Sequence, residues 1–184
     1  MIRNIVFDMG QVLLCYDPSM PCLRCTGGDR EAARILREAI FNTPEWVEVD
    51  AGTLTEEEMM KDWYLDTLWP KQGMAEVVQS LHERGYKLYI LSNAAPSFRA
   101  YQYKLPHPEL FSGMLVSAEE KLLKPDAAIY HRLCDKFGLK AEECVFIDDL
   151  PVNVEGAERV GMHGYCYADG DVERLKAFLK NIEG

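Results

Sequence analysis

Long apolar runs are missing from this sequence, and so is any excess of basic residues. No stretch approaches the roughly 20 apolar residues that a membrane-spanning helix needs. We expect no secretory signal peptide, because the apolar run after Arg3 is short and is interrupted by Asp8. Lysine and arginine number 20 against 30 aspartates and glutamates, so a nucleic-acid surface is not expected. Internal repeats and low-complexity tracts are also absent, and we expect a cytoplasmic protein.

The length and composition are those of an ordinary globular domain. A chain of 184 residues suits one domain with a small insertion and can bury a sizeable core. Apolar residues make up 48% and charged residues 27%, which is usual for a soluble protein. Because the net charge is −10, any phosphate site must gather positive charge locally, from a metal, a lysine or backbone N–H groups.

The six cysteines include a CxxC motif formed by Cys22 and Cys25, with Cys15 nearby. A tetrahedral zinc site needs four ligands, yet only these three cysteines cluster and no histidine is close in sequence. The other three cysteines lie in apolar-patterned segments, as small buried hydrophobic residues do. We interpret all six as structural, and a regulatory disulfide between Cys22 and Cys25 is the alternative.

A helical pattern without strands fills residues 16–69. Apolar residues recur at helical spacing over 32–40, and residues 55–58 are typical of a capping box. This capping box predicts a further helix that continues through Leu68, and residues 43–55 are expected to form the turn before it. The segment therefore has the character of an all-helical insertion.

From Pro70 onward, strands and helices alternate. Apolar runs predict a first strand over residues 3–7 and later strands over residues 87–91, 113–116, 144–147 and 164–167. Helical periodicity predicts helices over residues 74–84, 96–104 and 127–137, one that begins at 151, and one over 175–182. Alternation with short connections indicates an α/β fold, in which helices cover both faces of a doubly wound parallel sheet.

Polar residues follow several of the predicted strands. They are Asp8, the pair Ser92 and Asn93, Lys124 before Pro125, and the pair Asp148 and Asp149. Because the carboxyl ends of parallel strands meet at one edge of a sheet, we expect these side chains to surround one crevice. A carboxylate nucleophile, a hydroxyl–amide pair, a lysine and an acidic pair suit phosphoryl transfer to aspartate with a divalent cation.

Taken in order, these residues resemble the four motifs of the haloacid dehalogenase-like superfamily, most closely its small phosphatases with a helical cap. The motifs stand at residues 7–13 (FDMGQVL), 91–93 (LSN), 124–126 (KPD) and 147–157 (IDDLPVNVEGA). The resemblance implies a Rossmann-like core formed by residues 1–15 and 70–184. It also implies a small all-helical cap, residues 16–69, inserted after the first strand.

The resemblance further implies which residues act on the substrate. Asp8 is the expected nucleophile, which forms an aspartyl phosphate and so divides ester cleavage into two steps. Ser92 and Asn93 are expected to bind phosphate oxygens. Lys124 is expected to neutralise the transferred group and Asp8 together.

The metal implied by the resemblance is Mg²⁺. Its expected ligands are the carboxylates of Asp8 and Asp149 and the backbone carbonyl of Gly10. Asp148 is expected to act through a water of the metal shell, and Asn153 to support that shell with its side-chain amide.

One position departs from the usual family pattern. Most family phosphatases carry a second aspartate two residues after the nucleophile, where this chain has Gly10. That aspartate protonates the leaving group and then activates the hydrolytic water. A subgroup of sugar-phosphate phosphatases, to which alpha-D-glucose-1-phosphate phosphatase belongs, shares the pattern Asp-x-Gly-x-Val, so Gly10 is compatible with activity.

The sequence therefore predicts a magnesium-dependent phosphatase that acts on a small phosphorylated metabolite, such as a sugar phosphate. One alternative is a 2-haloacid dehalogenase, which uses the same nucleophile without a metal and also lacks the second aspartate. Another is a non-catalytic phosphate- or metal-binding relative. The acidic pair at 148 and 149 favours phosphate chemistry. The expected partner is a small phosphate ester rather than nucleic acid or membrane, and the chain is expected to be a monomer or a weak homo-oligomer.

Overall fold

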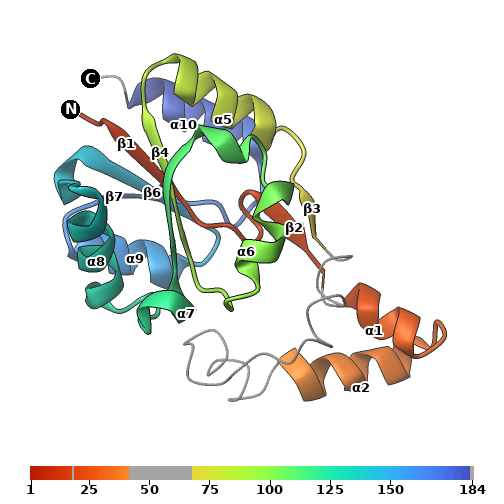
Figure 1. Ribbon diagram of the computed structural model, residues 1–184. Coiled ribbons are helices and arrows are strands. Elements are labelled where there is room, and N and C mark those ends of the chain that lie inside the picture. The colour runs from red at the N-terminus through yellow and green to blue at the C-terminus, as the bar shows by residue number, and fades with distance from the viewer. Residues whose placement is uncertain (18, 42–67, 183–184) are drawn as a thin grey trace.

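The computed structural model describes residues 1–17, 19–41 and 68–182 and has an α/β fold (Figure 1). Its main sheet has five parallel strands in the order β5-β4-β1-β6-β7. In chain order these strands are β1 (Asn4–Phe7), β4 (Lys87–Ser92), β5 (Phe111–Val116), β6 (Cys144–Asp148) and β7 (His163–Cys166). The predicted fold class is confirmed, and each predicted strand is present with its bounds moved by two residues at most.

Alternation along the strands sends apolar side chains to both faces of the sheet. In β1, Ile5 and Phe7 join one core cluster and Val6 joins the other. Helices α5 (Met74–Glu83) and α10 (Val172–Asn181) cover the first cluster. Helices α8 (Ala127–Phe137) and α9 (Pro151–Arg159) cover the second, on the opposite face (Figure 1). Burial on both faces explains why the strands are continuous apolar runs in the sequence.

Shorter helical segments complete the connections between strands. The helix predicted over residues 96–104 is a four-residue helix, α6 (Phe98–Tyr101), followed by a 3₁₀ turn, η1 (Gln102–Lys104). A further 3₁₀ turn, η2 (Pro108–Leu110), precedes β5, and η3 (Ala141–Glu143) precedes β6. One short helix was not predicted: α7 (Ser117–Glu120) directly follows β5.

A small antiparallel pair of strands joins the core to the inserted segment. β2 (Leu14–Tyr16) pairs with β3 (Leu68–Pro70), with Tyr16 opposite Leu68. The expectation that residues 16–69 contain no strand is therefore wrong at both ends, and Leu68 lies in a strand rather than in a helix. Strands of three residues are too short to produce a recognisable alternation of apolar and polar residues, and proline, present here as Pro70, is uncommon within strands.

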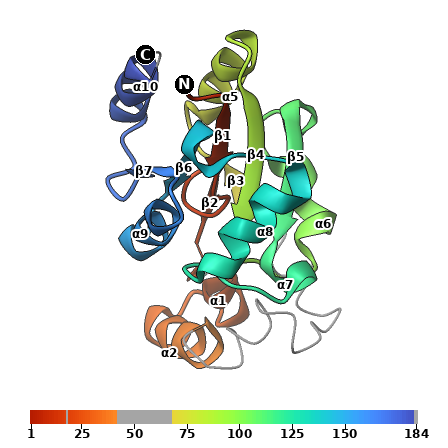
Figure 2. The same ribbon diagram turned by 90° about the vertical axis from the view of Figure 1, so that its left-hand side faces the viewer.

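Two helices of the inserted segment are described. α1 (Ser19–Cys25) and α2 (Arg30–Phe41) follow β2 and project from the core in both views (Figures 1 and 2). The helical periodicity at residues 32–40 is thus confirmed. The predicted turn at 43–55 and nearly all of the helix after it lie outside the described residues.

The cysteines are free thiols in this structure, with Cys22 buried and Cys25 exposed. Across residues 1–17, 19–41 and 68–182, no helix has the length and apolar character needed to cross a membrane.

Candidate active site

Most of the predicted site residues come from the carboxyl ends of three adjacent strands and from one loop, and Asn153 comes from α9. Asp8 directly follows β1, and its backbone N–H donates to the Ile147 carbonyl of β6 at 2.8 Å. Ser92 ends β4, while Asp148 ends β6. Lys124 lies in the loop between α7 and α8 and precedes Pro125 through a cis peptide bond. The order of the strands, with β1 between β4 and β6, brings Asp8 to the middle of the site.

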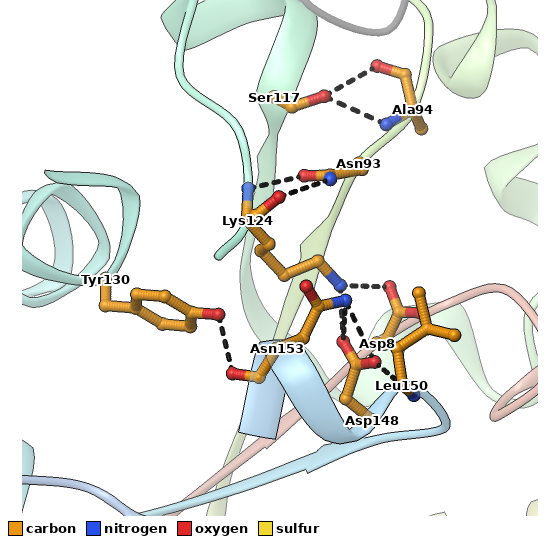
Figure 3. A network of polar contacts seen from close by, with 9 residues as sticks. All are labelled: Asp8, Asn93, Ala94, Ser117, Lys124, Tyr130, Asp148, Leu150 and Asn153. Carbon is orange, nitrogen blue, oxygen red and sulfur yellow. Dashed lines mark hydrogen bonds and ion pairs between the residues drawn. The ribbon is translucent and has the colours of Figure 1, made fainter. Parts of the chain in front are cut away.

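Lys124 bridges two carboxylates in the buried centre of this site (Figure 3). Its Nζ lies 2.8 Å from Asp8 Oδ1 and 2.6 Å from Asp148 Oδ2, and its side chain is 1% exposed. Burial lowers the pKa of Lys124, but the charges of Asp8 and Asp148 outweigh burial and leave that pKa above its ordinary value. The lysine is therefore held as a cation between two acids.

Burial raises the pKa of the Asp8 carboxyl to about 6, and the neighbouring Asp148 charge adds to this rise. The Lys124 ammonium acts in the opposite direction and favours the ionised carboxylate. A carboxylate taken out of water in this way is less stabilised than an exposed one and is a stronger nucleophile for that reason.

The two members of the acidic pair have different surroundings. Asp148 is fully buried, and both of its oxygens accept hydrogen bonds: Oδ1 from the Leu150 N–H at 2.9 Å, and Oδ1 and Oδ2 from Asn153 Nδ2 at 3.0 and 3.1 Å. Asp149 is half-buried and forms no ion pair with the residues that the structure describes. Burial, followed by the charge of Asp148, raises the pKa of Asp149.

Asp8, Asp148 and Asp149 each offer a carboxylate oxygen, and these three oxygens lie within 4.8 Å of one another. Ligand oxygens placed about 2.1 Å from a Mg²⁺ ion are at most about 4.2 Å apart, so small side-chain rotations suffice to bind the ion. Oxygen-only ligands are those that Mg²⁺ prefers. Because Asp148 is already saturated with hydrogen bonds, Asp8 and Asp149 are the better donors.

Residues 9–12 form a tight turn directly after Asp8. Gln11 has a left-handed backbone with φ of 55°, and the Val12 N–H donates to the Gly10 carbonyl at 2.7 Å. A carbonyl oxygen has two lone pairs, so the Gly10 carbonyl keeps one for another partner. Among the described residues, no atom beyond the two chain neighbours lies within 4 Å of the place that a Gly10 Cβ atom would take, so the described part of the chain leaves this position open.

Ser92 and Asn93 differ in how far their side chains are engaged. Ser92 is buried, and its hydroxyl makes no hydrogen bond to another residue in the described part of the chain. Asn93 is bound in both directions to the Lys124 backbone: its Nδ2 donates to the carbonyl at 3.1 Å, and its Oδ1 accepts from the N–H at 2.9 Å. Asn93 thus fixes the Lys124 loop and keeps one amide hydrogen, and its predicted role in binding phosphate stays a prediction.

Two residues at the site were not identified from the sequence. Ser117, fully buried at the start of α7, has its Oγ 3.0 Å from the Ala94 N–H and 3.3 Å from the Ala94 carbonyl, so it holds the loop after β4. Its place directly after a predicted strand was the available signal. Lys71, from the end of β3, donates to the Gln11 carbonyl at 2.6 Å and lies 4.6 Å from the centre of the Tyr167 ring. Nothing in the sequence pattern near Lys71 indicated this contact.

Comparison with known proteins gives one family. Residues 2–161 match the sequence model of the haloacid dehalogenase-like hydrolases. A chloroplast flavin mononucleotide hydrolase of Arabidopsis thaliana is 26% identical over 141 residues, which cover 68% of this chain and 58% of the plant protein. A sesquiterpene phosphatase of Aspergillus oryzae is 26% identical over 185 residues, covering 91% of this chain and 90% of the fungal enzyme.

A solved structure extends the comparison to the fold. It is a mutant haloacid dehalogenase-family enzyme of Bacteroides thetaiotaomicron in complex with magnesium and inorganic phosphate. The two chains superpose with a TM-score of 0.73 at 19% identity, covering 90% of this chain and 94% of the other. At that identity the likeness concerns the fold alone.

Proposed function

Because this chain belongs to the haloacid dehalogenase-like hydrolase family, we propose that it is a magnesium-dependent phosphatase. Its substrate is a small phosphorylated metabolite, such as a sugar phosphate, and the reaction passes through an aspartyl phosphate on Asp8. The observation that carries this proposal is the arrangement around Asp8. A buried lysine holds that carboxylate from one side, and Asp149 completes a group of oxygens suited to a divalent cation.

The reaction divides into two displacements. In the first, a carboxylate oxygen of Asp8 attacks phosphorus, the bond from phosphorus to the leaving oxygen breaks, and that oxygen takes a proton from solvent. In the second, water attacks the phosphorus of the aspartyl phosphate and loses a proton to solvent. The bond from phosphorus to Asp8 then breaks and releases inorganic phosphate, which restores the carboxylate.

The protein side chains bind and position the phosphoryl group. Lys124 places a positive charge beside Asp8, where negative charge collects on the transferred oxygens. The Ser92 hydroxyl and the remaining amide hydrogen of Asn93 supply neutral donors. Asp8, Asp149 and the Gly10 carbonyl would hold Mg²⁺, which supplies further neutralisation of the phosphate charge. Asp148 and Asn153 keep Lys124 and the ligands in place.

The dehalogenase alternative is weaker because of the acidic pair. A metal-free displacement at carbon needs no cation, whereas the oxygens of residues 8, 148 and 149 converge as cation ligands do. The non-catalytic alternative rests on Gly10 alone, since the other motif residues converge on Asp8. Relatives named as a flavin mononucleotide hydrolase and a sesquiterpene phosphatase also support phosphate-ester chemistry.

We assign residues 16–69 to a cap and residues 1–15 and 70–184 to the core. The cap would exclude water from the site and contact the leaving group, and its residues would therefore set substrate preference. A cytoplasmic monomer or weak homo-oligomer completes the proposal.

Turnover of an aryl phosphate, measured with Mg²⁺ and with a chelator, tests this function. We expect hydrolysis with Mg²⁺, loss of activity in chelator, and recovery when Mg²⁺ is added back. The matched control is Asp8→Asn, which keeps the side-chain shape but should reduce the rate by at least about 10⁴-fold. Full activity in chelator on a 2-haloacid would support the dehalogenase, and binding of phosphate without turnover would support the non-catalytic protein. A panel of metabolite phosphates then identifies the substrate.

A further inference from the structure

Tyr130 of α8 has a buried hydroxyl that contacts the start of α9 (Figure 3). Its Oη donates to the backbone carbonyl of Asn153 at 2.7 Å. Burial raises the pKa of this phenol, so it stays a hydrogen-bond donor across the physiological range. The ring packs edge-on against Phe146 of β6 at 5.5 Å between centroids, which fixes the direction in which the hydroxyl points.

Asn153, whose backbone carbonyl binds the Tyr130 hydroxyl, also binds Asp148, the buried acid of the site. The Asn153 side-chain amide donates to both oxygens of Asp148, and Asp148 accepts from Lys124, which also binds Asp8. A continuous series of contacts therefore runs from the Tyr130 hydroxyl to the nucleophile. All five residues in it are buried, so water does not compete for these hydrogen bonds.

Gly156 shows that the backbone of α9 leaves room for this hydroxyl. A Cβ atom at Gly156 would lie 2.9 Å from Tyr130 Oη and 2.8 Å from the Pro125 carbonyl oxygen. Any side chain there would push α9 away from Tyr130 and from the loop that carries Lys124. Two independent features, the hydroxyl and the missing side chain, thus serve the same contact between α8 and α9.

We infer that Tyr130 is a positioning residue for phosphoryl transfer: its hydroxyl fixes Asn153, and through Asn153 the pair Asp148 and Lys124 beside the nucleophile. This inference rests on the proposed function. Tyr130 does not reach the substrate, so it acts on the alignment of Lys124 and Asp8 during chemistry. Its loss should lower kcat and leave KM nearly unchanged.

The variant Tyr130→Phe removes one oxygen and keeps the ring that packs on Phe146. We expect kcat for an aryl phosphate at saturating Mg²⁺ to fall by about tenfold, which is typical of residues that do not touch the substrate but hydrogen-bond to the groups that do. The matched control is Tyr89→Phe, because Tyr89 is also buried in the second core cluster and its ring packs against Phe137, which is not a residue of the site. This control should keep its kcat within twofold of wild type.

A double-mutant cycle separates positioning from general damage to the core. If Tyr130 acts through the Asn153 amide, Tyr130→Phe should change kcat by less than twofold in an Asn153→Ala background. Equal kcat values for Tyr130→Phe and Tyr89→Phe, or effects of Tyr130 and Asn153 that multiply fully, would overturn the inference. Failure of the proposed function is distinct, since the wild-type protein would then show no turnover at all. Urea unfolding of each variant verifies that folded enzyme is compared.

Discussion

On the β6 side of Asp8, a lysine and a second carboxylate form a buried network, whereas on the side of residues 9–12 the chain offers a backbone turn. Lys124 contacts Asp8 and Asp148, and Asp148 is held further by Leu150 and Asn153. On the other side, none of the residues that the structure describes, apart from the two chain neighbours, has an atom within 4 Å of the position of a Gly10 Cβ. The nucleophile thus lies between a saturated side and an open side.

This difference separates two tasks of catalysis. The saturated side holds charges in fixed positions, which stabilises a transferring phosphoryl group without reorganisation. The open side is where, by resemblance to most family phosphatases, a carboxylate would move protons to and from the leaving group. A general acid–base contributes on the order of 10²–10⁴-fold. We therefore expect rates that depend strongly on the leaving group, with aryl phosphates and sugar 1-phosphates favoured over alkyl phosphates.

Among the variants that test this comparison, the largest effect is expected at Asp149, the half-buried member of the acidic pair. Asp149→Ala should raise the Mg²⁺ concentration for half-maximal activity by more than about 100-fold, because a direct ligand matters more than the supporting residues that cost 10–100-fold. Asp148→Asn is the comparison: it should shift the Mg²⁺ requirement by about tenfold and mainly lower kcat, since Lys124 loses a counter-charge. A larger Mg²⁺ shift for Asp148→Asn would reverse the roles of the two acids.

Packing on the saturated side should tolerate no extra atoms. Gly156→Ala places a methyl group 2.8 Å from the Pro125 carbonyl and should lower the free energy of unfolding by about 1–3 kcal/mol. Gly10→Ala is a matched control on the open side, where the new methyl meets no atom of the described residues within 4 Å. Urea unfolding measures both. Equal stabilities for the two variants would contradict the view that one side is full and the other empty.

A carboxylate introduced at position 10 tests whether the open side lacks a proton-transfer group. The Cβ atom of Gly10→Asp meets no atom of the described chain within 4 Å, and the new carboxylate should supply the absent proton-transfer group. We expect hydrolysis of alkyl phosphates to rise by about tenfold, a fraction of the full contribution of a general acid, because nothing on the chain was shaped to aim the new carboxylate. Aryl phosphates should change little, since their leaving groups need no proton.

Gly10→Asn is the control for Gly10→Asp, because it has the same shape without a titrating group. A leaving-group series on the three proteins measures the sensitivity of the first step, and rapid quench with labelled substrate measures phosphorylated Asp8. If the wild-type enzyme shows flat rates across leaving groups and no phosphoenzyme accumulates, another residue already performs this proton transfer.

Sequence patterns located the two carboxylates of the saturated side because these residues follow apolar strands. Asp8 and Asp148 come directly after continuous apolar runs, so the parallel sheet alone predicted that they would meet. Lys124 was also expected to follow a strand, but it lies in the loop after α7, so only its resemblance to a motif indicated its role. Tyr130 was hidden because it lies on the apolar face of α8, where its periodicity is that of a core residue.

The turn after Asp8 and the strands next to it were harder to predict. The left-handed Gln11 and the Lys71 contact to its carbonyl depend on how residues 11 and 71 meet in space. The strands β2 and β3 contain three residues each, too few for a periodic signal. Local pattern therefore predicts where a strand ends, whereas contacts between distant turns follow from the assembled fold.

The smallest effect is expected away from both sides of the nucleophile, where Glu120 joins α7 to α8. It accepts hydrogen bonds from Lys136 and, at 2.7 Å, from Arg132. The Lys136 hydrogen bond, against the effect of burial and together with Arg132, lowers the pKa of Glu120.

A carboxyl group whose pKa is lower in the folded protein than in the unfolded chain stabilises the fold at pH values above its unfolded pKa of about 4.3. This stabilisation is lost as pH falls through the pKa of the folded state. Because Arg132 is half-exposed, Glu120→Gln should cost only about 0.5 kcal/mol at neutral pH. The difference from wild type should be fully present above about pH 4.3 and should shrink as pH falls further in urea unfolding. Glu155→Gln, at an exposed site on α9, is the control for the loss of one surface carboxylate. A Glu120→Gln deficit that persisted in acid would mean that packing, rather than charge, links α7 to α8.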